Sequence, residues 1–420
     1  MRLLLIENSK TIISLIQVQL AEMVDVSVDW ASTKEQAISL IETNGVESYC
    51  LVVTGLKISD ANDGSIVTTI IEYQIPTIIF SSDYSEELRD KFIQMPGVVD
   101  YVVKESQASL RYLCNIIYRL IVNRTIKALV VDDSRTMRMY VCELLRQHQF
   151  KVLEASDGEE ALNILQENRD IKLVVTDFNM EGMNGFDLTK KIRETYDKDE
   201  LAIIGLSGMD TATLSARFIK TGANDFLRKP FEPEEFFCRI TQNMELIEKS
   251  KKLLDMATKD FLTGLYNRRF FFDKGSKKIA RLLAQKKPGY VAMLDIDHFK
   301  SVNDTYGHDV GDEVLREISS ILLQKIRACD LVARMGGEEF CIIFEDADKG
   351  TAENLLENMR RAIEECIIPS LQERRHVTSS FGAVPIQAGE KLDVTVKRAD
   401  DLLYKSKQSG RNRLTIEALN

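Results

Sequence analysis

Several common signals are missing from this chain. None of its seven cysteines forms a CxxC pair, and their odd number does not suit a disulfide framework, so a reducing compartment is expected. No stretch approaches the ~20 apolar residues that span a membrane. The N-terminal segment MRLLLIENSK carries charge too early for a signal peptide. These absences predict a cytoplasmic protein with no membrane partner.

Features of nucleic-acid binding and of P-loop enzymes are also missing. The formal net charge is −10, and neither a long basic run nor a basic helix-turn-helix segment occurs, so DNA binding is not expected. The pattern GxxxxGK[ST] is absent. Hydrophobic residues make up 44% and charged residues 29% of 420 residues, a balance typical of a globular chain. A chain of this length predicts about two to four domains.

A pattern repeats along the first half of the chain at an offset of 122 to 126 residues. The repeated blocks are LVVTGL and LVVTDF (51–56 and 173–178), 3–9 and 128–134, 78–82 and 204–208, and 98–104 and 223–229. In the second copy, helical patterns separate five short β-branched runs at 127–131, 151–154, 171–176, 202–206 and 225–227. This alternation predicts two α/β units, each a doubly wound parallel sheet.

Polar side chains gather where the strands of the second copy end. Asp132 and Asp133 follow the first strand, Asp177 ends the third, Ser207 ends the fourth, and Lys229 follows the fifth. The carboxyl ends of parallel strands share one edge of the sheet, so these groups should converge. Three crowded carboxylates favour a bound cation, and Mg²⁺ suits an all-oxygen site. A carboxylate can also act as a nucleophile towards phosphorus.

In this order the residues resemble the receiver domain of two-component response regulators, a flavodoxin-like fold. The resemblance implies a cognate histidine kinase as partner. It also assigns three groups of residues: Asp177 as phosphoacceptor; Asp132, Asp133 and Asp177 as Mg²⁺ ligands; and Ser207, Lys229 and Phe226 as the switch that responds to the phosphoryl group. The second receiver is placed at 124–246. The alternative is a doubly wound domain with solvated acids at its loop ends.

The first copy, residues 1–123, departs from this pattern. Glu7 and Asn8 replace the acid pair, and Gly55 replaces the phosphoacceptor, while Ser81, Tyr101 and Lys104 remain in place. Glycine has no side chain, so this copy cannot hold an aspartyl phosphate there. We predict a degenerate receiver that serves as an adaptor for packing and dimerisation.

A helix is expected to join the receivers to the rest of the chain, with residues 247–259 as the linker. Phe237, Ile240, Met244, Ile247 and Leu254 are spaced by three and four residues, apart from the last interval, which Lys251 interrupts. Such spacing predicts a heptad seam, which would suit a parallel dimer. The alternative is an ordinary last receiver helix followed by a loose linker.

From residue 260 a different pattern begins. In LVARMGGEEFCIIF, two apolar runs flank Gly336 and Gly337, which predicts a hairpin with a two-residue Gly-Gly turn. In YVAMLDIDHFK, a buried strand at 290–294 ends at Asp295. If this strand lies beside the hairpin, Asp295 meets Glu338. Two such carboxylates with a backbone carbonyl between them can hold Mg²⁺ on a triphosphate.

Together with DFLTGLYNRRFFF and YKSKQSGRNR, these motifs resemble the diguanylate cyclase, or GGDEF, domain, written here as GGEEF. The resemblance implies an α+β nucleotidyl-cyclase domain over 260–420. It assigns roles to these residues: Asp295, the Ile296 carbonyl and Glu338 for Mg²⁺; Glu338, and secondarily Glu339, for catalysis; Asn303 and Asp312 for guanine; Phe299, Lys300, Gly336, Gly337, Lys407 and Arg411 for the rest of GTP. His298 and His308 lack the spacing of a metal site.

Arg327 and Asp330 stand just before the hairpin. They match the RxxD motif through which cyclic di-GMP inhibits members of this family, although a plain surface ion pair has the same spacing. The family often adds a further arginine from the next helix, and Asn358 stands at that position.

The resemblance as a whole implies a phosphorylation-regulated diguanylate cyclase. Two GTP molecules would give cyclic di-GMP and two pyrophosphates in a homodimer, because one chain holds one cyclase domain and the product is two-fold symmetric. The alternative is a non-catalytic protein that binds GTP or cyclic di-GMP and signals by contact.

Overall fold

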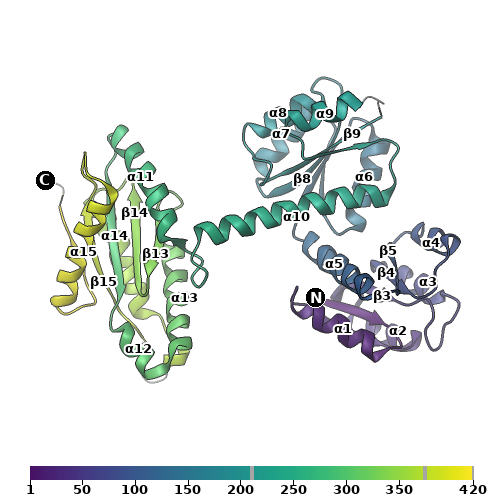
Figure 1. Ribbon diagram of the computed structural model, residues 1–420, viewed down its shortest axis with the longest axis horizontal. Coiled ribbons are helices and arrows are strands. Elements are labelled where there is room, and N and C mark those ends of the chain that lie inside the picture. Colours follow the sequence, from purple (N-terminus) through teal and green to yellow (C-terminus); the bar gives the residue numbers. More distant parts are fainter. Residues whose placement is uncertain (209–211, 372–375, 419–420) are drawn as a thin grey trace. The chain divides into compact units, whose positions relative to one another are not determined.

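The computed structural model describes residues 1–208, 212–371 and 376–418. It separates into two compact units, Met1–Lys249 and Ser250–Asn420 (Figure 1). The first unit contains two five-stranded sheets and the second contains one six-stranded sheet. Within the described ranges, no helix has both the length and the apolar character that a membrane crossing requires.

The first sheet is parallel throughout, with strand order β2-β1-β3-β4-β5. Its strands are β1 Arg2–Ile6, β2 Ser27–Ala31, β3 Tyr49–Thr54, β4 Thr77–Ser81 and β5 Val98–Val103. Helices α1 Lys10–Ala21 and α5 Gln107–Asn123 cover one face, and α2 Lys34–Asn44, α3 Ser65–Glu72 and α4 Glu86–Ile93 cover the other. The central strands are buried on both faces, so they are continuously apolar rather than alternating.

The second sheet repeats this topology, with order β10-β9-β8-β6-β7 and parallel pairing. Its strands are β6 Lys127–Val131, β7 Lys151–Ala155, β8 Ile171–Asp177, β9 Ala202–Ser207 and β10 Asp225–Arg228. Helices α6 Arg135–Gln147 and α10 Pro233–Thr258 cover one face, and α7 Gly158–Glu167, α8 Gly185–Arg193 and α9 Ala212–Thr221 cover the other. The five strands and the doubly wound fold expected from the sequence are thus confirmed.

Gly205 in β9 lets helix α9 pack closely on the sheet. A Cβ atom at this position would lie 2.5 Å from the Phe218 ring. The ring is fully buried against the strand. A side chain at this point of β9 would force the Phe218 ring to shift.

Helix α10 is continuous through the residues expected to form the linker. Proline stands at its first position and two glutamates follow in the first turn, which favours helix initiation. Its buried positions are Phe236, Ile240, Asn243, Met244 and Ile247, and its apolar members pack into the core of the second sheet. The exposed apolar residues of α10 are Leu246, Leu253, Leu254 and Met256.

The expectation of a heptad seam on this helix is therefore wrong for four of its five positions. Ile240, Met244 and Ile247 lie in the core, and Phe237 packs against it. Only Leu254 remains exposed. A helix that covers a sheet needs the same three- and four-residue spacing as one that pairs with a partner helix, so the pattern did not separate the two.

The second unit is a mixed sheet with order β11-β13-β14-β12-β15-β16. Its strands are β11 Tyr266–Asn267, β12 Gly289–Ile296, β13 Leu331–Gly336, β14 Glu339–Glu345, β15 Ser379–Pro385 and β16 Leu414–Ile416. Helices α12 Phe299–Tyr306, α13 His308–Lys325 and α14 Lys349–Glu365 cover one face. Helices α11 Arg268–Ala284 and α15 Leu392–Gln408 cover the other.

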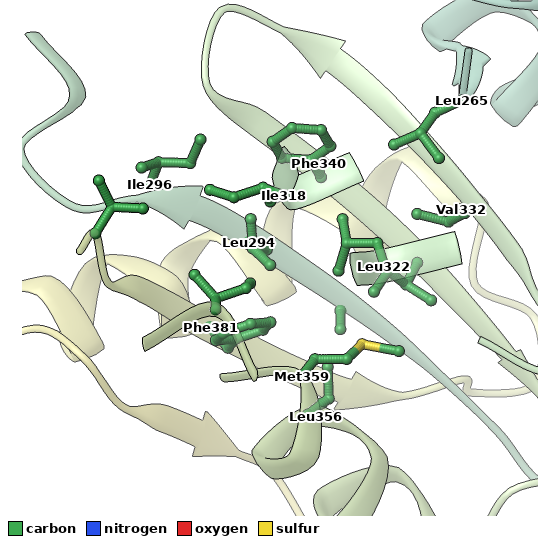
Figure 2. Close-up of a cluster of buried hydrophobic side chains, with 14 of the residues drawn as sticks. Leu265, Leu294, Ile296, Ile318, Leu322, Val332, Phe340, Leu356, Met359 and Phe381 are labelled. Atoms are coloured by element: carbon green, nitrogen blue, oxygen red, sulfur yellow. The ribbon is translucent and has the colours of Figure 1, made fainter. Parts of the chain in front are cut away.

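The strand β12 at the centre of this sheet is buried along its whole length. Leu294 and Ile296 point into the core shared with α13 and α14, where Phe340 and Phe381 flank them from the neighbouring strands (Figure 2). Met293 points to the opposite core. Such burial fixes the end of β12, and the candidate site begins there.

Candidate functional site

The end of β12 brings Asp295 beside the hairpin of β13 and β14. The antiparallel register pairs Asp295 with Glu339, and the Ile296 N–H donates to the Glu338 carbonyl at 3.4 Å. In the sheet Glu339 thus stands opposite Asp295, a shift of one residue from Glu338, which the sequence predicted to meet Asp295. Both glutamates nevertheless lie close enough to influence the Asp295 carboxylate.

The position of the hairpin turn explains this shift. Strand β13 runs to Gly336 and β14 starts at Glu339, so the loop is Gly337-Glu338 rather than Gly336-Gly337. The register shifts between Arg334 and Gly336, which moves the turn along the chain. Both glycines have positive φ, 138° and 55°, a conformation that L-residues with a side chain rarely adopt.

Arg334 fixes the turn, and the sequence had not suggested this role. Its Nε and Nη2 atoms donate to the Gly337 carbonyl at 2.9 and 2.8 Å. Its Nη1 atom donates to Asp260 Oδ1 at 3.0 Å. Asp260 belongs to the DFLTGLYNRR motif, so that motif is tied directly to the GGEEF hairpin.

Asp295 has an unusual electrostatic environment. Burial raises its pKa, Lys407 at 2.8 Å lowers it, and Glu338 and Glu339 raise it again, with the net result a pKa of about 6. A cation offsets such crowding of carboxylates, so the oxygen donors of Asp295 and Glu338 fit Mg²⁺. Of the residues that the structure describes, no three His, Cys, Asp or Glu gather as a metal site. The Mg²⁺ ligands predicted from the sequence are instead two carboxylates, those of Asp295 and Glu338, and the backbone carbonyl of Ile296.

Lys407 therefore lies at the carboxylate site. It comes from the last turn of α15, and its side chain is only 31% exposed. Arg411 lies four residues further on, in the turn between α15 and β16, and has a positive φ of 63°. The two cations predicted to contact the phosphates thus come from one helix end.

The predicted guanine residues lie where α12 meets α13. Asn303 of α12 packs against Gly311, whose missing Cβ would overlap the Asn303 Oδ1 atom. Asp312 is the next residue and is half-buried. Lys300 is exposed, whereas Phe299 is a core residue with 7% exposure. The structure thus groups Asn303 with Asp312 and places Phe299 in the core.

The RxxD pair is part of the internal structure of the domain. Arg327 donates from Nε and Nη2 to the Asp330 carboxylate at 2.9 and 2.8 Å, and from Nη2 to the Glu345 carbonyl at 2.7 Å. The Asp330 side chain is 0% exposed and accepts the Glu345 N–H. The hydrogen bonds that Arg327 donates to Asp330 raise the pKa of Arg327. Arg327 is the more accessible member of the pair, and Asn358 of α14 is exposed.

In the second sheet, one lysine joins two of the three predicted acids. Lys229 Nζ lies 2.9 Å from Asp132 Oδ2 and 2.6 Å from Asp177 Oδ1. Burial raises the pKa of Asp177, whereas Lys229 lowers it and Asp132 raises it. Asp133 is exposed and stays outside this group.

The two remaining switch residues lie on neighbouring strands. Ser207 is buried at the end of β9, where its carbonyl accepts the Lys229 N–H at 2.8 Å. Phe226 in β10 is half-buried, with its ring centroid 6.1 Å from that of Phe218. Ser207 therefore lies next to Lys229, whereas Phe226 pairs with Gly205, two residues before Ser207 in β9.

In the first receiver-like sheet, Glu7 takes the place of the missing carboxylate. The Lys104 ammonium forms an ion pair with Glu7, and it lies 3.7 Å from the position of a Cβ at Gly55. Asp60, which follows the strand, accepts the N–H groups of Lys34 and Glu35 at the start of α2. The lysine is therefore satisfied without an acid at position 55.

Comparisons with known proteins agree with this geometry. A family model described as "Diguanylate cyclase, GGDEF domain" matches residues 257–413, and one described as "Response regulator receiver domain" matches residues 128–241. Response regulator PleD of Caulobacter vibrioides is 30% identical over 302 residues, 70% of this chain and 66% of PleD. Diguanylate cyclase VdcA of Vibrio cholerae is 30% identical over 279 residues, 64% of this chain and 80% of VdcA.

A solved structure of another protein is also similar to this chain. The crystal structure of a two-component system response regulator/GGDEF domain protein is 38% identical, with a TM-score of 0.54, and the match covers 59% of this chain and 99% of that one. The fold and the two family models thus define a receiver domain joined to a GGDEF domain. The chain belongs to the family of response-regulator proteins with a GGDEF diguanylate cyclase domain. The matched receiver is the second sheet; the first remains a predicted receiver.

Proposed function

We propose that the protein is a phosphorylation-regulated diguanylate cyclase that acts as a homodimer. The observation that carries this proposal is the group of carboxylates at the end of β12. Asp295 lies beside Glu338 and Glu339, burial holds its pKa near 6, and Lys407 pairs with it. This arrangement supports binding of a metal-triphosphate, for which an acidic edge and a nearby lysine are both needed.

The proposed reaction converts two GTP molecules into cyclic di-GMP and two pyrophosphates. Each 3′-oxygen attacks the α-phosphorus of the other GTP, the bond from that phosphorus to pyrophosphate breaks, and the proton of the 3′-hydroxyl passes to Glu338. Glu339 is the second candidate for this proton. Bound Mg²⁺, held by Asp295, the Ile296 carbonyl and Glu338, supplies positive charge to the triphosphate. Asn303 and Asp312 hold guanine.

Asp177 is the proposed phosphoacceptor for a histidine kinase. Its carboxylate lies at the carboxyl edge of the sheet with Lys229, the position from which a phosphoryl group can be contacted by Lys229 and Ser207. Phosphorylation adds about −1.5 to −2 charge at this point. We infer that Phe226 and Ser207 respond and that receiver pairing follows, which raises the concentration of one cyclase domain near the other.

The first sheet is proposed to act as an adaptor without a phosphoryl group of its own. The Glu7–Lys104 pair supports this view because the lysine already has a carboxylate partner within its own domain. Product inhibition is assigned to Arg327, which Asp330 orients. Because Asp330 is fully buried, we assign the direct contact with cyclic di-GMP to Arg327 and a supporting role to Asp330.

Chromatography of nucleotides after incubation with GTP and Mg²⁺ tests the proposal. Wild-type protein should form cyclic di-GMP, and beryllofluoride should increase the rate together with the dimer fraction in sedimentation. Asp177→Asn should remove this increase, whereas Asp170→Asn, at the opposite end of β8, should retain it. Absence of product under both conditions would refute catalysis and leave the non-catalytic binding protein. Product formation that ignores beryllofluoride would refute only the control by phosphorylation.

A further inference from the structure

The turn that carries Arg411 has a conformation that needs support. Gly410, Arg411 and Asn412 have φ values of 114°, 63° and 47°, so three successive residues lie at positive φ. Left-handed backbone is unfavourable for a residue with a side chain, and two such residues in succession persist only when surrounding contacts hold them. The contacts of this turn therefore decide where the backbone at Arg411 lies, and with it the origin of the Arg411 side chain.

One support comes from the end of β12. Asp297 is 2% exposed and its Oδ2 atom accepts the Asn412 backbone N–H at 3.0 Å. The same carboxylate accepts the hydroxyl groups of Thr378 and Ser380, each at 2.7 Å. These hydroxyls come from β15 and the residue before it. Asp297 thus joins the turn to two strands of the sheet.

A second support comes from α14. The Asn412 side chain accepts a hydrogen bond from Arg360 Nη1 at 2.6 Å and donates one to Glu364 Oε1 at 2.7 Å. Arg360 is itself held by Glu357, through two hydrogen bonds of 2.9 and 2.8 Å, and by Glu364 at 2.7 Å. Its side chain is only 13% exposed. The amide of Asn412 is therefore fixed on both its oxygen and its nitrogen.

We propose that Asp297 and Asn412 are positioning residues for the triphosphate of GTP. Asp297 lies two residues after Asp295. The end of β12 therefore carries both a predicted metal ligand, Asp295, and a residue that holds the turn containing Arg411. Lys407, one helical turn earlier, already reaches Asp295 at 2.8 Å. The inference rests on the proposed function, because it takes GTP as the ligand and Arg411 as a phosphate contact.

Binding of a GTP analogue by the full chain tests this assignment without turnover. Calorimetry with guanosine 5′-(α,β-methylene)triphosphate and Mg²⁺ is compared with GMP, which lacks the β- and γ-phosphates. Asn412→Gly keeps the backbone at positive φ and removes both side-chain contacts. We expect its affinity for the analogue to fall about tenfold, the effect of a lost charge-assisted contact, with GMP affinity unchanged. Asp297→Asn, which keeps the shape of the side chain, should act in the same direction.

Two controls separate positioning from general damage. Asn354→Ala, an exposed amide on α14, should leave both affinities and the melting temperature at wild-type values. In an Arg411→Ala background, Asn412→Gly should have no further effect on analogue binding, because both changes remove the same contact.

Three results would overturn the positioning role of Asp297 and Asn412. Equal losses for the analogue and GMP, unchanged analogue binding in Asn412→Gly, or additive losses with Arg411→Ala would each overturn it. Wild-type protein that binds the analogue but forms no cyclic di-GMP would refute the proposed function and leave this inference standing. Wild-type protein that fails to bind the analogue would overturn both.

Discussion

A single methyl group at Gly311 should test the proposed guanine contact. Gly311 lies in α13, and a Cβ there would overlap the Oδ1 atom of Asn303 and approach the Phe299 ring to 3.3 Å. The Asn303 amide can rotate away at little cost to the fold. It would then leave the position in which it is proposed to bind guanine.

Gly311→Ala should change the stability of the fold and the affinity for the GTP analogue in opposite directions. Replacing glycine by alanine inside a helix stabilises it by about 0.8–1 kcal/mol. Small adjustment of the Phe299 ring reduces this gain. Loss of one hydrogen bond to guanine should cost about 1 kcal/mol of binding, roughly a fivefold weaker affinity. The variant should therefore melt no lower than wild type while it binds the methylene analogue of GTP less tightly.

Scanning calorimetry and analogue titration measure the two effects on the same samples. Gly350→Ala is the matched control, because it lies in the first turn of α14 with its nearest neighbour atom 3.9 Å from the new Cβ. It should change binding by less than the error of the titration. In an Asn303→Ala background, Gly311→Ala should have no further effect on binding. Wild-type affinity in Gly311→Ala, or an equal loss with and without the Asn303 side chain, would refute the reasoning.

Three further predictions concern packing, pH and a buried ion pair. Gly205→Ala should lower the free energy of unfolding of the domain built on the second sheet by about 1–3 kcal/mol, because the new methyl group overpacks the core. Gly208→Ala should cause no such loss, because a Cβ there would have no neighbour within 4 Å. Equal melting curves for the two variants would contradict this prediction. Because the pKa of Asp295 is about 6, protons should compete with Mg²⁺, and the Mg²⁺ needed for half-maximal product formation should rise roughly fourfold from pH 7.5 to 5.5. A constant requirement across this range would show that Asp295 is not a ligand. Arg119→Ala should lower the free energy of unfolding of the first unit by about 1–3 kcal/mol, measured by urea unfolding, because the Arg119 side chain is 9% exposed and donates to both carboxylate oxygens of Glu248. If the losses of Arg119→Ala and Glu248→Gln simply added in the double variant, the two residues would not form a specific pair.

The sequence predicted the receiver edge well because parallel sheets constrain it strongly. Once Asp177 was placed at the end of a strand, the neighbouring strand ends had to carry Asp132 and Lys229 to the same edge. In the structure the Lys229 ammonium lies 2.9 Å from Asp132 and 2.6 Å from Asp177, so these three side chains share one edge of the sheet. Asp133 is the exception: it follows Asp132 directly but is exposed, because neighbouring residues at a strand end point in different directions.

The residues that support the cyclase site were harder to find. Asp297 and Asn412 lie 115 positions apart in the chain, and their contact depends on how β12, β15 and the turn after α15 pack. Local pattern carries no information about such a contact. The one-residue shift of the GGEEF turn has a similar cause, since it follows from a register irregularity near Arg334 that has no marker in the sequence.

The continuity of α10 has a mechanical consequence. Its buried segment is anchored in the second sheet, and the eleven residues from Glu248 to Thr258 extend the same hydrogen-bonded helix by about 16 Å. A helical segment is a stiffer spacer than an irregular segment of the same length. Leu253 and Met256, which are exposed, therefore belong to the same hydrogen-bonded helix as the turns that are buried against the second sheet.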